Sequence, residues 1–250
     1  MTWFLDHLGD IAALASRHAM LAGVPLLLGL LVAIPLGWLA HRSPRWGPVL
    51  IAATGLLFTI PSLALFIVMP LFLGTRVLDP VNVVVAMTVY TVALLVRTVA
   101  DGLSSVPDHV RQAATAMGFG GSRRLLRVEL PIAVPVIAAG LRVAAVSNVS
   151  IVSIASLIGV AQLGDLLTDG YNRAFNAPLL TGILACVLLA LAYDALVLSM
   201  ARVLTPWRRA GLDEGRRTGR DNGRDADRDT AREPGVGDVA RAPEPAGESA

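Results

Sequence analysis

Residues 112–131 read Gln112-Ala-Ala-Thr-Ala-Met-Gly118-Phe-Gly-Gly-Ser-Arg-Arg-Leu-Leu-Arg-Val-Glu129-Leu-Pro131 and lie between two long apolar runs. The small or apolar positions of its first half are Ala113, Ala114, Ala116, Met117 and Phe119. These side chains predict a short helix whose small face can lie close in the groove of another protein. Gly118 can adopt a positive φ, so we expect the helix to end there and the chain to turn.

The second half of the stretch predicts another short helix, over residues 123–129. Its apolar positions, Leu125, Leu126 and Val128, lie opposite three arginines on a helical projection. Ser122 is a candidate N-cap for this helix. Pro131 suits the first turn of the membrane span that follows.

The composition of the chain is that of a membrane protein. Of its 250 residues 54% are hydrophobic and only 16% are charged, and the apolar residues come in blocks. Cys186 is the single cysteine, which excludes an intrachain disulfide, and the four histidines have no metal-ligand spacing. We therefore expect no metal site and no bound cofactor.

No catalytic constellation appears in the sequence. The chain contains no lysine, which excludes the Gly-Lys-Ser/Thr phosphate loop of a nucleotide-hydrolysing subunit. No surface that combines basic and aromatic residues suggests nucleic acid. We expect a non-enzymatic membrane protein whose energy, if it uses ATP, comes from a separate chain.

The apolar blocks predict an all-α membrane protein with about five transmembrane helices. The expected spans are residues 19–40, 47–73, 81–96, 132–157 and 179–204. Residues 1–17 predict an N-terminal interfacial helix, residues 18–205 the membrane domain, and residues 206–250 a disordered cytosolic tail with almost no large apolar side chains.

The arginines predict the orientation of these spans. One set of loops and ends holds Arg42, Arg45, Arg97, Arg111, Arg123, Arg124, Arg127, Arg208 and Arg209. The opposite set holds Arg17, Arg76 and Arg173 together with five aspartates. Because cytoplasmic loops are rich in basic residues, the first set is expected inside, with the N-terminus outside and the C-terminus in the cytosol.

Five spans enclose a passage poorly, so we expect two copies of this chain, or this chain and a partner, with the path between them. Candidate pathway residues are Pro61, Ser62, Asn148 and Ser150. Pro61 breaks the second predicted span and frees backbone carbonyls at membrane depth. The serines that recur every third position from Ser147 to Ser156 fit either close helix packing or a pore-facing strip.

Two ionisable residues fall inside predicted spans, at similar depths. Arg142 lies in the fourth span and Asp194 in the fifth. An unpaired charge there is expensive, so we expect partners. The favoured interpretation is a structural ion pair between the two spans, and contact with a substrate is the alternative.

The stretch 112–131 resembles the EAA loop of bacterial ABC-importer permeases. The matching positions are Gln112-Ala113-Ala114, Gly118 and Val128-Glu129-Leu130-Pro131, and Gln112 replaces the usual glutamate. The resemblance implies the type I ABC-importer permease fold, with the loop 104–131 as the coupling segment that docks on a cytosolic ATPase. It also implies ATP and Mg²⁺ on that ATPase, a second permease subunit and an extracytoplasmic substrate-binding protein.

Further motifs are similar to those of permeases for glycine betaine, carnitine and choline. They are Ala33-Ile-Pro-Leu-Gly37, Thr59-Ile-Pro-Ser-Leu-Ala-Leu65, residues 129–142 and Leu163-Gly-Asp-Leu166. Near the last of these, Gly159-Val-Ala-Gln-Leu-Gly164 departs from the richer glycine run of the family. The alternatives are an ABC permease for methionine or a sulfonate, and a stand-alone channel or ion-coupled carrier.

Overall fold

The structure is a computed structural model, and it describes residues 2–206. Most of the predicted disordered tail, with Arg208 and Arg209, lies outside the described residues. The described part is helical, without a strand between residues 2 and 206. Its elements are α1 (Thr2–Asp6), α2 (Leu8–Arg42), α3 (Gly47–Phe58), α4 (Ser62–Leu73), α5 (Pro80–Ser104), α6 (Asp108–Ala116), α7 (Gly121–Arg124), the π-helical turn η1 (Leu125–Glu129), α8 (Leu130–Val152), the 3₁₀ turn η2 (Ser153–Ile158), α9 (Gly164–Asn172) and α10 (Asn176–Leu204).

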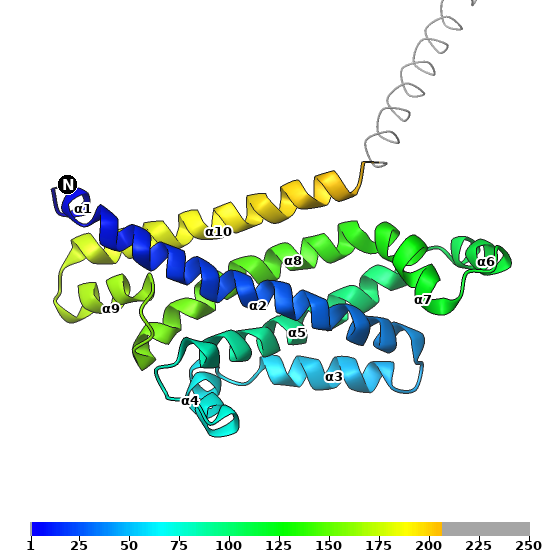
Figure 1. The fold of residues 1–250 in the computed structure, drawn as a ribbon, viewed down its shortest axis with the longest axis horizontal. Helices are drawn as coiled ribbons and strands as arrows, with labels where there is room; N and C mark the ends of the chain where they lie inside the picture. Colours follow the sequence, from blue (N-terminus) through cyan, green and yellow to red (C-terminus); the bar gives the residue numbers. More distant parts are fainter. Residues whose placement is uncertain (1, 207–250) are drawn as a thin grey trace, which may run out of the picture. The chain divides into compact units, whose positions relative to one another are not determined.

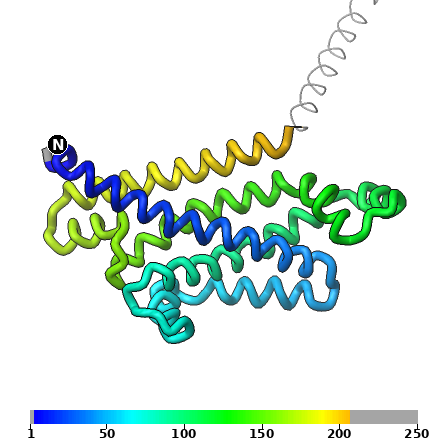
Figure 2. The backbone as a smooth tube through the Cα atoms, viewed as in Figure 1, coloured from blue at the N-terminus to red at the C-terminus, as the bar shows by residue number. Residues whose placement is uncertain are grey.

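The long helices run side by side between two ends of a bundle (Figure 1). The end that carries α6 and α7 is called the α6 end, and the opposite end, with α1 and α9, is called the α9 end. Helices α2, α5 and α10 run from the α9 end to the α6 end, and α8 returns. The tube in Figure 2 shows α2 crossing the bundle diagonally over α5 and α8.

Among residues 2–206, four helices are long and apolar enough to cross a membrane, and a bent pair makes five if it forms one span, which agrees with about five predicted spans. The pair is α3 and α4, which meet at an angle of 101°. The predicted break at Pro61 is therefore confirmed. Pro61 is the N-cap residue of α4, and the hydroxyl of Tyr90 on α5 donates to the carbonyl of Ile60 beside it. That carbonyl is thus satisfied inside the chain.

The predicted boundary between an N-terminal helix over 1–17 and the first span is wrong. A short α1 ends at Asp6, and α2 then runs without a break from Leu8 to Arg42. No proline interrupts α2 before Pro25, and the charged residues Asp10 and Arg17 fit within a helix that extends beyond the bilayer. The charges mark where the span leaves the apolar layer, and they do not end the helix.

Helix α5 forms the centre of the bundle, with Leu95, Val96, Val99 and Leu103 fully buried. Glycines let its neighbours approach closely. A Cβ at Gly29 of α2 would lie 2.4 Å from the Thr91 side chain, and one at Gly37 would lie 2.6 Å from Val99. On the other side, a Cβ at Gly140 of α8 would lie 2.3 Å from Thr98. Small residues at helix contacts are typical of membrane bundles, where van der Waals packing drives association.

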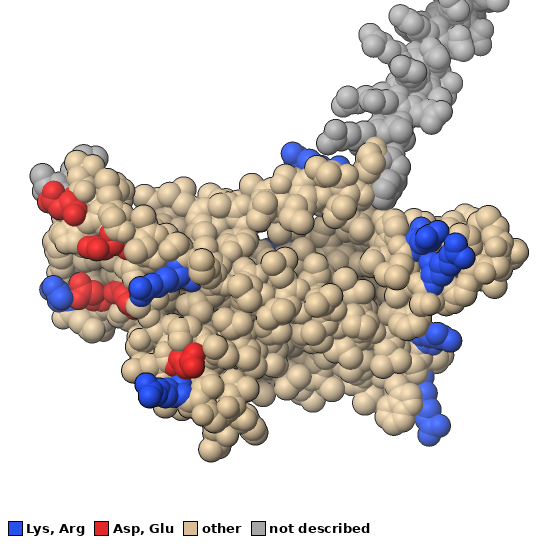
Figure 3. Space-filling view, viewed as in Figure 1, with Lys and Arg blue, Asp and Glu red and all other residues tan. Residues whose placement is uncertain are grey.

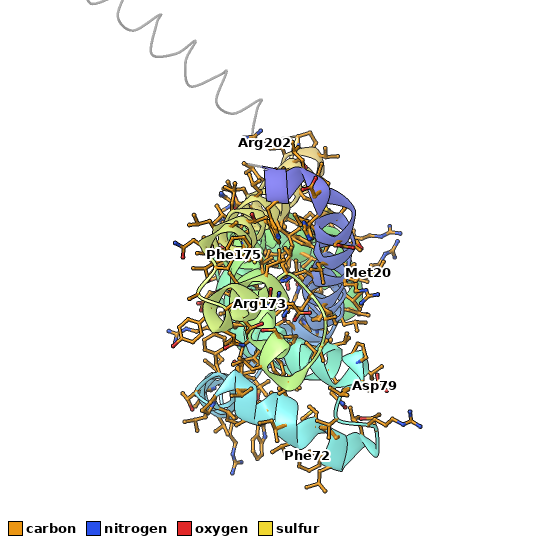
Figure 4. The ribbon with its side chains drawn as sticks, turned by 90° about the vertical axis from the view of Figure 1, so that its left-hand side faces the viewer. Met20, Phe72, Asp79, Arg173, Phe175 and Arg202 are labelled. Carbon is orange, nitrogen blue, oxygen red and sulfur yellow. The ribbon has the colours of Figure 1, made fainter. Side chains whose placement is uncertain are left out.

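The outside of the bundle is apolar along its length and charged at its ends. On the face shown in Figure 3, the acidic side chains gather at the α9 end and basic side chains occur at both ends. Figure 4 looks along the bundle from the α9 end and shows Met20 and Phe72 pointing away from it. Exposed apolar side chains between charged ends fit a protein surrounded by lipid.

The glycine contacts predict a sharp difference between two alanine substitutions. We expect Gly29→Ala to destabilise the bundle by about 1–3 kcal/mol, because its new methyl group overlaps Thr91. Gly55→Ala is the matched control in α3, where a Cβ meets nothing within 4 Å. Thermal unfolding of the purified protein in detergent measures both. An equal or higher melting temperature for Gly29→Ala than for Gly55→Ala would contradict the packing.

Candidate functional site

Helix α6 ends as the sequence predicts, at Gly118. This glycine has a φ of 81°. Its amide donates to Thr115 O at 2.9 Å, and the next amide, of Phe119, donates to Ala114 O at 3.1 Å. These two bonds form a Schellman motif, which closes a helix with a left-handed residue. The direction in which the chain leaves α6 is therefore set by a glycine.

The exposed face of α6 differs in one position from the predicted face. Gln112, Ala113 and Met117 are exposed, and Met117 has an exposed fraction of 69%. Ala114, however, is buried inside the chain, so it supports the loop and does not contribute to a docking face. Phe119 is half-buried, and the Arg123 guanidinium lies 5.4 Å from its ring centroid.

A buried ion pair ties α6 to the start of α8. Arg124 Nε lies 2.6 Å from Glu129 Oε1, and the Glu129 side chain is only 3% exposed. The same guanidinium donates through Nη1 to Thr115 Oγ1 of α6 at 2.9 Å. One arginine therefore connects α6 with the buried carboxylate that precedes α8.

A second chain of hydrogen bonds ties α6 to α2 and α5. Arg111 Nη1 donates to His41 Nε2 at 2.8 Å, so that nitrogen carries no proton. The His41 Nδ1–H donates to Ser104 Oγ at 2.9 Å, and Ser104 in turn donates to Ala100 O. Arg111 also contacts Asp108, and its guanidinium lowers the pKa of that carboxyl.

The helix predicted over residues 123–129 is not separate from the fourth span. It begins earlier, at Gly121 with Gly120 as the N-cap residue, so Ser122 is not the cap. It continues through the π turn η1 directly into α8. Pro131 explains the wider turn, because a proline lacks the amide proton and its ring collides with the carbonyl four residues earlier. Residues 121–158 therefore form one continuous helical rod.

A polar hollow of about 540 Å³ lies on the surface of α6. Its lining residues are Asp108, Arg111, Gln112, Thr115, Ala116 and Arg124. Gln112 therefore lies beside the two arginines that hold α6 in place. A partner that fills this hollow would contact the same side chains that fasten the loop to the bundle.

The predicted pathway residues are not brought together. Pro61 and Ser150 are exposed on different helices, and Ser62 is half-buried. Asn148 is 3% exposed and takes the packing role: its Nδ2 donates to Thr91 Oγ1 at 2.9 Å and to Ala22 O at 3.3 Å. It joins α2, α5 and α8, and it lies away from any surface that could line a passage.

Arg142 and Asp194 form the ion pair expected from the sequence. Arg142 Nε lies 2.6 Å from Asp194 Oδ1, and Nη2 lies 2.7 Å from Oδ2. This bidentate geometry joins α8 to α10. The side chains are 40% and 26% exposed, respectively, so the pair is open on one side.

Sequence reasoning missed a buried network at the α9 end. His18 is fully buried, with Nδ1 2.8 Å from Gln162 Oε1 and Nε2 2.9 Å from Val149 O. Gln162 also accepts from the Gly164 amide and donates to Ser153 O. The only sequence signal was a glutamine in a run where glycines were expected. The network fixes the segment after η2 to α2 and α8.

Comparison with known proteins identifies the family. The family described as "Binding-protein-dependent transport system inner membrane component" matches residues 26–209. This chain belongs to that family. The permease is 38% identical over 211 residues to the osmoprotectant import permease protein OsmW of Salmonella typhimurium, with 82% of this chain and 96% of the relative covered.

Another relative and a solved structure agree with this assignment. The glycine betaine/carnitine/choline transport system permease protein OpuCD of Bacillus subtilis is 30% identical, with 83% of this permease and 90% of the relative covered. A chain of the MetNI methionine ABC transporter, in an inward-facing conformation, matches with a TM-score of 0.72 at 18% identity. The match covers 80% of this permease and 98% of the MetNI chain. The fold is that of an ABC importer permease, in the inner membrane.

Removal of the Arg124–Glu129 ion pair is expected to lower the stability of the permease. Arg124→Ala leaves a buried carboxylate without its partner, and we expect a loss of about 1–3 kcal/mol. Arg127→Ala is the control, because Arg127 is an exposed residue of the same π turn. Thermal unfolding and limited proteolysis of residues 112–128 measure the effect. Equal melting temperatures and equal cleavage in the two variants would contradict a fastening role for Arg124.

Proposed function

We propose that the chain is the membrane subunit of an ATP-driven importer whose coupling helix is α6. The observation that carries this proposal is the construction of the α6 end. A helix with an exposed small and apolar tip is fastened by Arg124 to a buried carboxylate, and that carboxylate opens a continuous rod through the membrane. A stand-alone channel or carrier has no need of such a linkage.

The proposed orientation places the α6 end in the cytosol. Arginines gather there, among them Arg42, Arg45, Arg97, Arg123 and Arg127. The α9 end carries more aspartates than arginines among the described residues. Because basic residues favour the cytoplasmic side, the N-terminus lies outside and the C-terminus inside. The ATPase then has access to α6.

The proposed assembly contains two permease chains, cytosolic ATPase subunits and an extracytoplasmic binding protein. The hollows at α6 and between outer helices open on the surface of the bundle. A second permease chain, identical or paralogous, closes the path. ATP and Mg²⁺ act on the ATPase, since this chain has no lysine for a phosphate loop.

The proposed cargo is a quaternary-amine osmoprotectant, such as glycine betaine, carnitine or choline. The names of the relatives support this class, and the similarity extends over most of both chains. Quaternary ammonium groups are usually bound by aromatic cages, whereas only 5% of this chain is aromatic. Tight recognition is therefore assigned to the binding protein, and the permease supplies a weakly binding passage.

Gln112 is a proposed contact residue for the ATPase. It is exposed on α6, in the polar hollow, where the family usually has a glutamate. An amide keeps an acceptor and adds a donor, but it removes a negative charge. We propose that the matching ATPase groove offers hydrogen-bonding groups at this point in place of a basic residue.

Uptake of labelled solutes tests the proposed function. We expect a strain that lacks this chain to lose uptake of glycine betaine or choline, and the cloned gene to restore it. Methionine uptake should be unaffected. Restoration of methionine or sulfonate uptake, without any change for quaternary amines, would overturn the proposed cargo and leave the permease assignment standing.

A pair of glycine substitutions tests the coupling role of α6. Gly118→Val puts a β-branched residue at a φ of 81° and should reduce uptake at least tenfold with normal membrane insertion. Gly120→Val is the control, since Gly120 has a φ of −67° and a Cβ there meets nothing within 4 Å. Normal uptake and normal ATPase co-purification in the Gly118→Val variant would contradict coupling through this loop.

A further inference from the structure

The Arg142–Asp194 pair lies where an exposed charge is unfavourable. Arg142 is twelve residues after Leu130, a rise of about 18 Å along α8. Asp194 is ten residues before Leu204, or about 15 Å from that end of α10. Both side chains are therefore near the middle of a bilayer whose hydrocarbon layer is about 30 Å thick.

The exposed side of the Arg142–Asp194 pair is not expected to face the hydrocarbon chains of the lipid. The Arg142 and Asp194 side chains are 40% and 26% exposed, so this chain covers neither of them completely. A charge at this depth costs several kcal/mol against lipid, so such residues face a bundle interior or a water-filled cavity. The face formed by α8 and α10 must therefore be turned toward water or a polar partner in the assembled transporter.

The surface beside Arg142 fits a passage that binds its cargo weakly. Residues three or four positions from Arg142 on α8 are Ala139 and Val146, and Ser150 lies one turn further along. All three are exposed and none of them is ionisable; Ala139 and Ser150 are small, and Val146 is an apolar side chain with an exposed fraction of 43%. A wall of this kind allows close approach of a compact solute without holding it, and the ion pair is its one strongly polar feature.

We propose that Arg142 and Asp194 form a transient site for a zwitterion, with the substrate exchanging places with the ion pair. The inference rests on the proposed function. The carboxylate of glycine betaine would pair with the planar fork of Arg142, and its trimethylammonium group would lie against Asp194. One ion pair is exchanged for two, so the net affinity stays low, as conduction requires.

The site distinguishes a zwitterion from a simple cation. Choline offers a positive charge and a hydroxyl group, so it pairs with Asp194 and leaves Arg142 without a carboxylate. Arg142 is thus a specificity-determining residue that favours substrates carrying a carboxylate. A purely structural ion pair would have no influence on the choice between two substrates.

The test compares the KM for uptake of glycine betaine with that of choline in cells that express the whole transporter. For Arg142→Gln we expect the ratio of the two KM values to rise at least tenfold, because the carboxylate contact is lost and Asp194 is freed for choline. The double variant Arg142→Met/Asp194→Leu replaces the ion pair with two apolar side chains, so the protein can fold without an unpaired charge. This variant should raise the KM for both substrates. Immunoblots measure the amount of each variant in the membrane.

The matched control neutralises an ion pair at the α9 end, with Asp169→Asn/Arg173→Gln. That pair joins residues one turn apart on the surface, at 2.7 Å, and its loss should leave both KM values unchanged. An unchanged ratio in Arg142→Gln, or wild-type KM values in the apolar double variant, would overturn the site. If Arg142→Gln fails to reach the membrane, the apolar double variant decides. Failure of the wild-type transporter to move either solute would instead refute the proposed function.

Discussion

Polar groups inside a bilayer have no water to bond, and this constraint determines how the bundle is held together. No buried side-chain nitrogen or oxygen in the described part of the chain lacks a partner. Asn148 joins three helices, Tyr193 donates to Ala19 O between α10 and α2, and Tyr90 closes the break at Ile60. In these cases polar side chains inside the bundle, including the pathway candidate Asn148, hold helices together.

The same constraint separates a rigid part of the molecule from a part that can respond to a partner. Glycine contacts and buried polar bonds fix α2, α5 and α8 against one another. At the α6 end, the bonds that hold the coupling helix are made by arginines that remain partly exposed, Arg111 and Arg124. In the proposed function, a protein that docks on α6 competes for these arginines, and the continuous helix from α7 through α8 is the element that would carry a displacement into the membrane.

Much of this arrangement could be predicted from the sequence. The apolar blocks, the positive φ of Gly118 and the positions of Arg142 and Asp194 along their spans are local or one-dimensional properties. The structure contains the long apolar helices, the left-handed Gly118 and the ion pair expected from them. The prediction that an N-terminal helix ends at residue 17 was wrong. Charged residues mark the edge of the apolar segment, but the helix continues through them. The end of α6 at Gly118 could be predicted because its signal is contiguous in the chain.

The parts that sequence reading missed depend on contacts between distant segments. The sequence around Ala114 does not show that this side chain becomes buried in the folded loop. The spacing of three residues between the serines from Ser147 to Ser156 does not show which of them face inward. The Arg124–Glu129 pair and the His18–Gln162 network join residues whose burial is known only once the helices are packed. The sequence places Glu129 in a motif, and the structure shows that its carboxylate is buried and paired with Arg124.

Photo-crosslinking from Met117 tests the central claim most directly. A photoreactive amino acid at this exposed position, in cells that express the whole transporter, should crosslink to the ATPase subunit. The same amino acid at Tyr171, which is 82% exposed at the α9 end, should not. A crosslink to the ATPase from Tyr171, with none from Met117, would place the coupling helix on the wrong side of the membrane and contradict the account.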